Sequence, residues 1–396
     1  MLHQVQQSGS VSWDINYEIR NSLMLLEFIE FLTEGTRIDH PEDLIFSDGS
    51  QGAARAVQAL AEVPTHAQDI TIKWDGFPAL VFGRNHDGRL VVADKHMFTK
   101  KDGSGRVTSL QAFVQYDVNR GSNRGDLYEK LKVLWPAFEQ AVPKGTKGYY
   151  WGDLLWTGQL QPQHGMYSFK PNTVTYSVSA SSPIGQRIAQ SIGGIVVHQY
   201  FADFDQEPQV LEGTGQLNTK GPLYILTPNM PDQVKLQEPV QLVKAAQQAL
   251  KTYGGAVDQL LDPTNLVPIR CKDLGQLMQK YINARVRGEA RKFVDWLPGV
   301  VSGNKLKSLV GENKDGYLYQ NPNGLNGAFA IFEAILNLKS GLIKQLDSQQ
   351  QTIQSSVNGQ PGGEGYVFNT SHGLIKLVNR SSFSAANFAK NESIRD

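Results

Sequence analysis

The sequence is poor in the features that mark several large protein classes. It has a single cysteine, Cys271, among 396 residues, which rules out an internal disulfide and a zinc site built from several cysteines. Its 38 basic and 38 acidic residues balance, so no global field attracts it to nucleic acid or to a membrane. It contains no apolar run near the roughly 20 residues that cross a bilayer. We therefore expect a cytoplasmic protein that makes no membrane contact.

Catalytic motifs of several enzyme classes are missing as well. The glycine-rich stretch Gly103-Ser104-Gly105 is not followed by the Gly-Lys-Ser/Thr of a phosphate-binding P-loop. No Gly-x-Ser-x-Gly segment provides the exposed serine of an α/β-hydrolase. The eight histidines are spread singly along the chain, without the spacing of metal ligands. A structural role is therefore the expectation for isolated histidines such as His198.

Helical and β-type segments alternate along the chain, which predicts an α+β fold. Apolar residues at helical spacing predict helices over 21–35, 50–63, 124–141, 236–253, 273–296 and 325–350. Runs of β-branched and aromatic residues predict strands over 70–74, 79–83, 89–93, 148–156, 172–178, 195–197, 365–369 and 374–378. A hairpin turn is expected at 85–88, and the segment 354–363 is expected to be a flexible connection.

These elements predict a division of the chain into four parts. Residues 1–40 form an N-terminal extension with a helix, and residues 41–204 form the first part of an α+β domain. A mostly helical insertion over 205–360 interrupts that domain, and the strands of 361–396 close it. Two stretches far apart in the sequence are therefore expected to meet in one domain.

The most distinctive local pattern is Lys73-Trp74-Asp75-Gly76, at the end of a predicted strand. Burying a charged lysine is costly, so a lysine that ends a buried strand usually has a chemical reason to be there. Burial favours the neutral amine, and a neutral amine is a nucleophile. Gly76 permits a tight turn and the close approach of a ligand to the backbone. On its own, however, the pattern is also compatible with a surface lysine on an edge strand.

Three further motifs follow in a characteristic order: Gly152-Asp153, Glu364-Gly365 and Lys376. This order resembles the covalent nucleotidyltransferase superfamily of ATP-dependent DNA and RNA ligases and capping enzymes. The chain is most similar to the phage and editing-type RNA ligases of the second class. The residues that carry this likeness are Glu364-Gly365-Tyr366-Val367, Ile375-Lys376, Asn379 and Phe383-Ser384.

The resemblance implies a fold and an activity. It implies a ligase-type adenylyltransferase domain, with antiparallel sheets and flanking helices, that carries the large helical insertion. Only twenty residues follow Lys376, so no C-terminal OB domain is expected. The implied activity is that of an ATP-dependent polynucleotide ligase acting through a covalent lysyl-AMP, joining RNA ends in preference. The likeness to phage enzymes suggests a viral source, in which case the compartment is the host cytoplasm.

The resemblance also assigns roles to individual residues. Lys73 is the nucleophile, and Lys376 contacts the α-phosphate of ATP and stabilises its developing charge. Asp153 and Glu364 hold Mg²⁺ or Mn²⁺, directly or through water. The remaining expected nucleotide contacts are Asp75 and Gly76 in the first motif, Arg84 or Lys95 for the ribose or a phosphate, and Tyr176 stacked on adenine.

Several departures from the family pattern leave alternatives open. The family more often has Glu where Asp153 stands, Val378 replaces a second lysine, and Pro78 occupies the place of an arginine, which puts Arg84 in doubt. Each motif residue alone also fits a turn, loop or outward-facing strand position. The alternatives are a DNA ligase or another nucleotidyltransferase with a different acceptor, and an inactive ligase-like protein that binds nucleic acid or a virion.

A basic region within the insertion suggests how an acceptor is held. Residues 270–310 contain nine basic and three acidic residues, with Tyr281, Phe293 and Trp296 among them. Positive charge with interleaved aromatics suits nucleic acid that carries 5′-phosphate and 3′-hydroxyl ends, RNA above all. The same pattern also fits a solvated helix face whose aromatic residues belong to the core.

Overall fold

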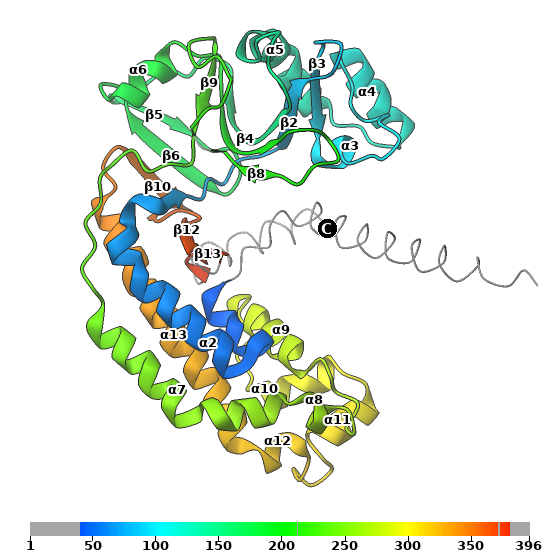
Figure 1. The fold of residues 1–396 in the computed structure, drawn as a ribbon, viewed down its shortest axis with the longest axis vertical. Coiled ribbons are helices and arrows are strands. Elements are labelled where there is room, and N and C mark those ends of the chain that lie inside the picture. The colour runs from blue at the N-terminus through cyan, green and yellow to red at the C-terminus, as the bar shows by residue number, and fades with distance from the viewer. Residues whose placement is uncertain (1–39, 212, 371–372, 381–396) are drawn as a thin grey trace, which may run out of the picture. The chain divides into compact units, whose positions relative to one another are not determined.

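The computed structural model describes residues 40–211, 213–370 and 373–380 (Figure 1). The predicted helix over 21–35, the rest of the N-terminal extension up to residue 39, and Phe383-Ser384 lie outside the described residues. The chain has the expected mixed α+β composition, and its sheets are antiparallel apart from one parallel strand pair. Among the described helices, none combines the length and the apolar character needed to cross a membrane.

Three long helices pack along one another: α2 (Leu44–Glu62), α7 (Val240–Leu261) and α13 (Pro322–Gln349). Glycines on α13 allow this close approach, because a Cβ at Gly324 would lie 2.5 Å from the carbonyl oxygen of Ala256 on α7. The helices joining α7 to α13 are α8 (Pro263–Leu266), α9 (Leu274–Val286), α10 (Phe293–Trp296), η3 (Leu297–Gly299), α11 (Gly303–Leu309) and α12 (Tyr317–Gln320).

The predicted continuous helix over 273–296 is wrong in its second half. Helix α9 ends at Val286, and Gly288 adopts a φ of 98°, which a right-handed helix does not accommodate. The chain then starts again as the short helix α10.

Cys271, just before α9, is buried, and burial raises the pKa of its thiol to about 11. A thiol that stays protonated at neutral pH is a poor nucleophile.

A small sheet has the order β1-β12-β13, formed by β1 (Ile70–Ile72), β12 (Tyr366–Thr370) and β13 (Gly373–Leu377). It joins the segment before Lys73 to the segment after Glu364, as the sequence predicted. The short helices η1 (Pro41–Asp43) and η2 (Val63–Asp69) flank α2 on the way into this sheet.

A larger sheet has the order β3-β2-β4-β7-β8, with β9 beside β7. Its strands are β2 (Ala79–Arg84), β3 (Leu90–Asp94), β4 (Tyr149–Thr157), β7 (Gly193–Phe201), β8 (Gln209–Val210) and β9 (Leu223–Leu226). Helix α5 (Gly125–Ala141) lies against it, with the rings of Phe82 and Phe138 4.9 Å apart. The helices α3 (Lys95–Phe98) and α4 (Leu110–Asn119) follow β3 in the chain.

A third sheet, β11-β10-β6-β5, corrects the expected flexible connection over 354–363. It contains β5 (Met166–Phe169), β6 (Val174–Ser179), β10 (Ile353–Val357) and β11 (Gln360–Pro361), and α6 (Pro183–Ala189) follows β6. Strand β10 pairs with β6 along its whole length and buries Ile353 and Val357. The serines and the glutamine between these two residues hide a strand pattern that only pairing reveals. The helical region therefore ends at α13, before residue 360.

Candidate active site

Lys73 and Glu364 meet across the edge where β1 and β12 pair. The Lys73 backbone N–H donates to the carbonyl oxygen of Gly365 at 2.9 Å, which continues the β1–β12 register by one residue. The Lys73 Nζ donates to Glu364 Oε1 in an ion pair whose side chains are 29% and 12% exposed. Strand pairing between segments 291 residues apart thus brings the predicted nucleophile to the predicted metal-binding carboxylate.

Lys376 lies on the same face of this small sheet as Lys73. The register pairs Lys376 with Val367, and Val367 with Thr71, so these three side chains share one face. Lys73, two residues after Thr71, points the same way. The opposite face is apolar and buried, which explains why the lysines occupy the partly exposed side. The buried side chains are Ile70, Ile72, Phe368, Ile375 and Leu377.

Asp75 holds the loop that follows Lys73. Its buried carboxylate accepts hydrogen bonds from the backbone N–H groups of Thr173 and Val174 at 2.5 and 2.7 Å, and from Asn172 Nδ2 at 2.7 Å. Its own backbone N–H donates to the Tyr176 hydroxyl at 2.7 Å. With both oxygens accepting from protein donors, Asp75 orients the loop.

Gly76 brings this loop against strand β4 at Asp153. A Cβ at Gly76 would lie 2.4 Å from the Cβ of Asp153, so no other residue fits at that position. On β4, Gly152 is equally constrained, because its Cβ would lie 2.4 Å from the carbonyl oxygen of Val196. Steric contacts therefore explain why both motif positions are glycine. Together the two glycines allow Asp153 to lie beside the Lys73 loop.

Three further side chains gather around Asp153 on this face of the larger sheet. His198 Nε2 lies 3.2 Å from Asp153 Oδ2, and the His198 ring centroid lies 6.0 Å from that of Trp151. The Lys95 ammonium lies 5.1 Å from the centroid of the Trp151 ring. Lys95, the second expected phosphate contact, thus belongs to the surroundings of Asp153.

The charges of the motif residues act on one another. Burial, helped by the negative charges of Asp75 and Asp153, raises the pKa of Glu364 to about 7, against the lowering effect of the Lys73 ammonium. Burial and the same carboxylates also raise the pKa of the Tyr176 hydroxyl. Residues from three separate parts of the sequence therefore share one electrostatic environment. Perturbed carboxylates of this kind are typical of functional sites.

The raised pKa of Glu364 predicts a pH-dependent stability. The folded chain holds the Glu364 proton more tightly than the unfolded chain does, so this contribution is complete below pH 4.5 and is lost as the pH rises through about 7. The loss is on the order of 3 kcal/mol. Urea unfolding at pH 5 and pH 8 should show a steeper decline for the wild type than for Glu364→Gln, which does not titrate. Equal slopes for the two proteins would contradict the raised pKa.

The structure does not support Arg84 as a nucleotide contact. Its side chain is buried, with Nε donating to the carbonyl oxygen of Val142 at 3.0 Å and Nη2 donating to that of Glu139 at 3.0 Å. Nη1 forms an ion pair with the Glu139 carboxylate at 2.8 Å. The guanidinium fixes the β2–β3 hairpin to the end of α5, which is a structural role that the sequence did not indicate.

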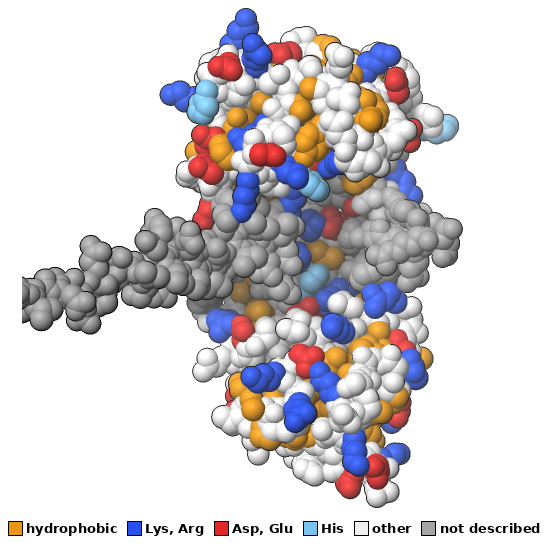
Figure 2. Space-filling model, turned by 90° about the vertical axis from the view of Figure 1, so that its right-hand side faces the viewer, with side chains coloured by type: hydrophobic (Ala, Val, Ile, Leu, Met, Phe, Trp, Pro, Cys, Tyr) orange, Lys and Arg blue, Asp and Glu red, His pale blue; other side chains and the backbone are white. Residues whose placement is uncertain are grey.

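In the basic region 270–310, the aromatic residues belong to the core. Tyr281, Phe293 and Trp296 are buried, with ring centroids 5.3 to 6.1 Å apart. They are therefore not placed to stack on bases. Several of the nine cations are neutralised by carboxylates: Arg291 pairs with Glu289, Lys305 with Asp273 and Lys307 with Glu312. Lys and Arg side chains are nevertheless spread over the face shown in Figure 2.

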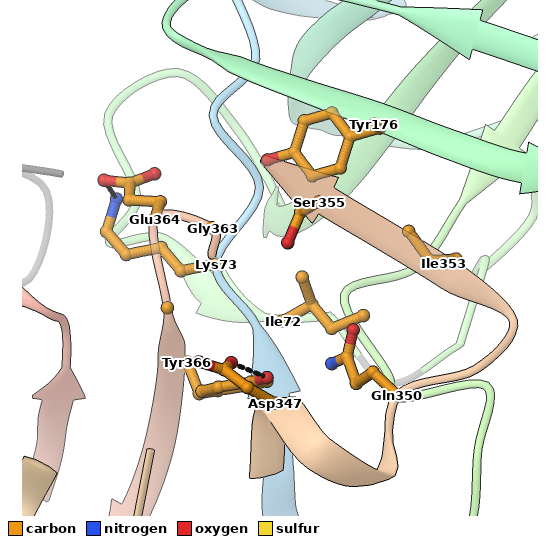
Figure 3. A pocket seen from close by; sticks show the side chains of 11 residues that line it. Ile72, Lys73, Tyr176, Asp347, Gln350, Ile353, Ser355, Gly363, Glu364 and Tyr366 are labelled. Atoms are coloured by element: carbon orange, nitrogen blue, oxygen red, sulfur yellow. Dashed lines mark hydrogen bonds and ion pairs between the residues drawn. The ribbon is translucent and has the colours of Figure 1, made fainter. Parts of the chain in front are cut away.

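A narrow pocket adjoins the Lys73–Glu364 pair (Figure 3). Tyr176, expected to stack on adenine, lines it, with its ring 4.8 Å from that of Trp74. Asp347 and Gln350, from the C-terminal end of α13, also line it. Sequence reasoning missed these two residues and His198. No motif marks Asp347 or Gln350, and only the pairing of β4 with β7 places His198 beside Asp153.

Comparison with known proteins identifies the family of the chain but indicates no activity. Searches of curated proteins and of solved structures gave no match. One family model matches residues 35–392 of the chain, and its description is a family of unknown function, DUF6267. Since the match covers most of the chain, the chain belongs to the DUF6267 family.

Proposed function

We propose that this chain is an ATP-dependent nucleotidyltransferase in which Lys73 forms a covalent lysyl-AMP. The observation that carries the proposal is the contact between Lys73 and Glu364, with Asp153 beside the same loop and Lys376 on the same sheet face. A lysine, a second cation and two carboxylates in this arrangement suit attack on a phosphate.

The bonds and protons of the proposed reaction can all be accounted for with ATP and the side chains of the site. The neutral Lys73 amine attacks the α-phosphorus of ATP, a P–N bond forms, and the bond to the β-phosphate oxygen breaks to release pyrophosphate. The lysine must first lose a proton, and Glu364, which accepts a hydrogen bond from Nζ, is placed to take it. The adenylate then passes to a 5′-phosphate end, and a 3′-hydroxyl displaces AMP.

Asp153 and Glu364 suit a Mg²⁺ or Mn²⁺ ion that is held mainly by phosphates and water. In the described part of the chain, no three His, Cys, Asp or Glu side chains gather into a metal site of their own. Mg²⁺ at phosphates commonly takes only one or two carboxylates from the protein. When bound, the ion supplies positive charge that offsets the charge of the phosphates.

Lys376 is proposed to stabilise the charge that develops on the α-phosphate. Replacing it by methionine keeps much of the side-chain volume and removes the cation, so the rate of adduct formation should fall by about 10- to 100-fold. The measurement is the initial rate of labelling by ATP that carries the label in its α-phosphate. The matched control is Lys100→Met, at an exposed position. An unchanged rate for Lys376→Met would show that Lys376 takes no part in adduct formation.

A nucleic-acid acceptor, RNA in preference, agrees with the charge around the helical region. A groove beside α9 and α13 is lined by the basic residues Arg285 and Lys292 and by the aromatic residues Phe293 and Phe329. Backbone phosphates favour such cationic surfaces, and binding through them weakens with added salt. Joining assays on nicked RNA, RNA–DNA hybrid and DNA duplexes show which of these nucleic acids is the acceptor.

The decisive test is incubation with α-labelled ATP and Mg²⁺ or Mn²⁺, followed by denaturing gel analysis. The proposal expects a covalent label, released by acid as expected of a phosphoramidate, on the peptide that contains Lys73. A label on another peptide would show that the nucleophile is a residue other than Lys73. No label with any nucleoside triphosphate and either metal would favour the alternative, an inactive ligase-like protein that binds nucleic acid.

A further inference from the structure

Strand β7 contains a bulge opposite the middle of β4. Trp151 on β4 pairs with Gln199, and the next residue, Gly152, pairs with Val197. His198 is therefore an extra residue between two consecutive pairs of the ladder. A bulge bends its strand locally and re-aims a side chain, and bulges are frequent next to active sites. The position of His198 thus calls for an explanation in the site rather than in the sheet.

The bulge brings the His198 ring to the carboxylate of Asp153. His198 Nε2 lies 3.2 Å from Asp153 Oδ2, and the two side chains are 31% and 22% exposed. An imidazole that carries its proton on Nε2 donates a hydrogen bond to this oxygen. Among the described residues, none donates to the other oxygen, Oδ1. The contact therefore fixes one carboxylate oxygen and leaves the second one for a ligand.

The surroundings of His198 fix the ring itself. Its centroid lies 6.0 Å from that of the buried Trp151 ring, which is in turn stacked on Phe201 at 6.1 Å. The backbone carbonyl oxygen of His198 accepts a hydrogen bond from the Leu211 N–H at 3.3 Å. Both the backbone and the ring of the bulged residue are thus supported, so the donor that faces Asp153 is held in place.

Asp153 depends on such support because its side chain is short. The ligases that the chain resembles more often have Glu at this position, which reaches one methylene further. The direction of the Asp153 carboxylate therefore decides whether Oδ1 reaches an ion. Carboxylates that ligate metals are commonly held by hydrogen bonds from neighbouring residues, and losing such a partner typically weakens metal binding or activity by about 10- to 100-fold.

We propose that His198 is a positioning residue for the metal ion, holding Asp153 Oδ2 through its Nε2–H so that Oδ1 is presented to the ion. The inference rests on the proposed function, which gives Asp153 its ion, and it adds a residue that no motif marks. Since His198 acts through the carboxylate, its loss should weaken metal binding. Once the ion is saturating, the chemical step should be nearly as fast as in the wild type.

The direct test measures Mn²⁺ binding to the full chain together with an ATP analogue whose α- and β-phosphates are joined by a methylene group. This analogue cannot form the adduct, and the enhancement of water-proton relaxation reports the ion bound in the complex. His198→Leu should weaken Mn²⁺ binding about tenfold. His198→Gln, which keeps an N–H donor, should restore most of the affinity. His96→Leu, the same substitution at an exposed position of α3, should bind like the wild type.

The labelling assay gives a second readout, which a general disturbance of the fold would not reproduce. In His198→Leu, the Mg²⁺ concentration for half-maximal labelling by α-labelled ATP should rise about tenfold. The rate at saturating Mg²⁺ should fall by less than about threefold, because the lost contact serves binding of the ion. A fall in the saturating rate with an unchanged Mg²⁺ requirement would contradict a role through the metal.

The outcomes of the Mn²⁺ measurement decide the proposal on their own. Equal binding by the wild type and His198→Leu would overturn the positioning role. Equal loss in His198→Leu and His198→Gln would make the histidine a ligand of the ion and overturn it as well. A wild type that binds no Mn²⁺ would leave Asp153 without an ion to hold. Mn²⁺ binding that depends on His198, without any labelling by ATP, would retain the positioning role and refute the lysyl-AMP function, so the two failures are distinguishable.

Discussion

Replacing Lys73 by arginine is expected to abolish the covalent AMP adduct and to leave the fold intact. The guanidinium keeps the positive charge that pairs with Glu364. It stays protonated at any pH that the protein tolerates, so it has no free electron pair with which to attack phosphorus. Labelling by α-labelled ATP should fall at least about 10³-fold below the wild type, because the covalent step has no other nucleophile.

Arginine separates chemistry from structure more sharply than alanine does. Alanine would also leave Glu364 without its cation, so a loss of labelling could come from a disturbed site. Lys101→Arg, at an exposed position, controls for the substitution itself and should label like the wild type. Thermal unfolding should show similar midpoints for all three proteins. Wild-type labelling of Lys73→Arg would assign the adduct to another residue and end the present mechanism.

The order of the motifs was sufficient to predict which distant segments meet. Lys73 and Glu364 are brought together by pairing of β1 with β12, and both strands are visible as alternating apolar runs in the sequence. The sequence also marked Gly76 as a place of close approach to the backbone, and the structure shows that Asp153 makes this approach. These features are local or are repeated in a known order, which is why a sequence can carry them.

The contacts of long polar side chains were not predictable in the same way. Arg84 follows the first motif at a plausible distance, yet its guanidinium turns to the carbonyl oxygens of Glu139 and Val142. Gln350 carries no motif and reaches the pocket only because β10 pairs with β6 after α13 ends. The direction of a side chain depends on packing between elements that the sequence does not place.

A buried cluster of charged residues was not predicted from the sequence for the same reason. Substitutions in this cluster are expected to have the largest effect on stability. Glu42 on η1 and Lys339 on α13 are 0% exposed and form an ion pair. Arg380, which follows β13, donates to both carboxylate oxygens of Asp43 at 2.7 Å and lies 3.6 Å from Glu42. The cluster thus ties the start of α2 to α13 and to the end of the sheet that carries Lys376.

Removing Glu42 should destabilise the chain more than removing Lys339. Glu42→Ala leaves the buried Lys339 ammonium without its partner and close to the positive charge of Arg380. Burial already lowers the pKa of Lys339, and Glu42 opposes this more strongly than Asp43 does. The free energy of unfolding should fall by about 3 to 5 kcal/mol. In Lys339→Met, Glu42 still has Arg380 nearby, so the fall should be smaller, about 2 kcal/mol.

Urea unfolding measures both changes, and an exposed pair of the same residue types provides the control. Lys307 and Glu312 lie 2.7 Å apart with side chains 68% and 73% exposed, so Lys307→Met should change stability by less than about 0.5 kcal/mol. The double variant Glu42→Leu/Lys339→Met should recover much of the loss, since an apolar pair avoids burying a lone charge. If Glu42→Ala were as mild as Lys307→Met, the cluster would not be holding α2, α13 and the Lys376 strand together.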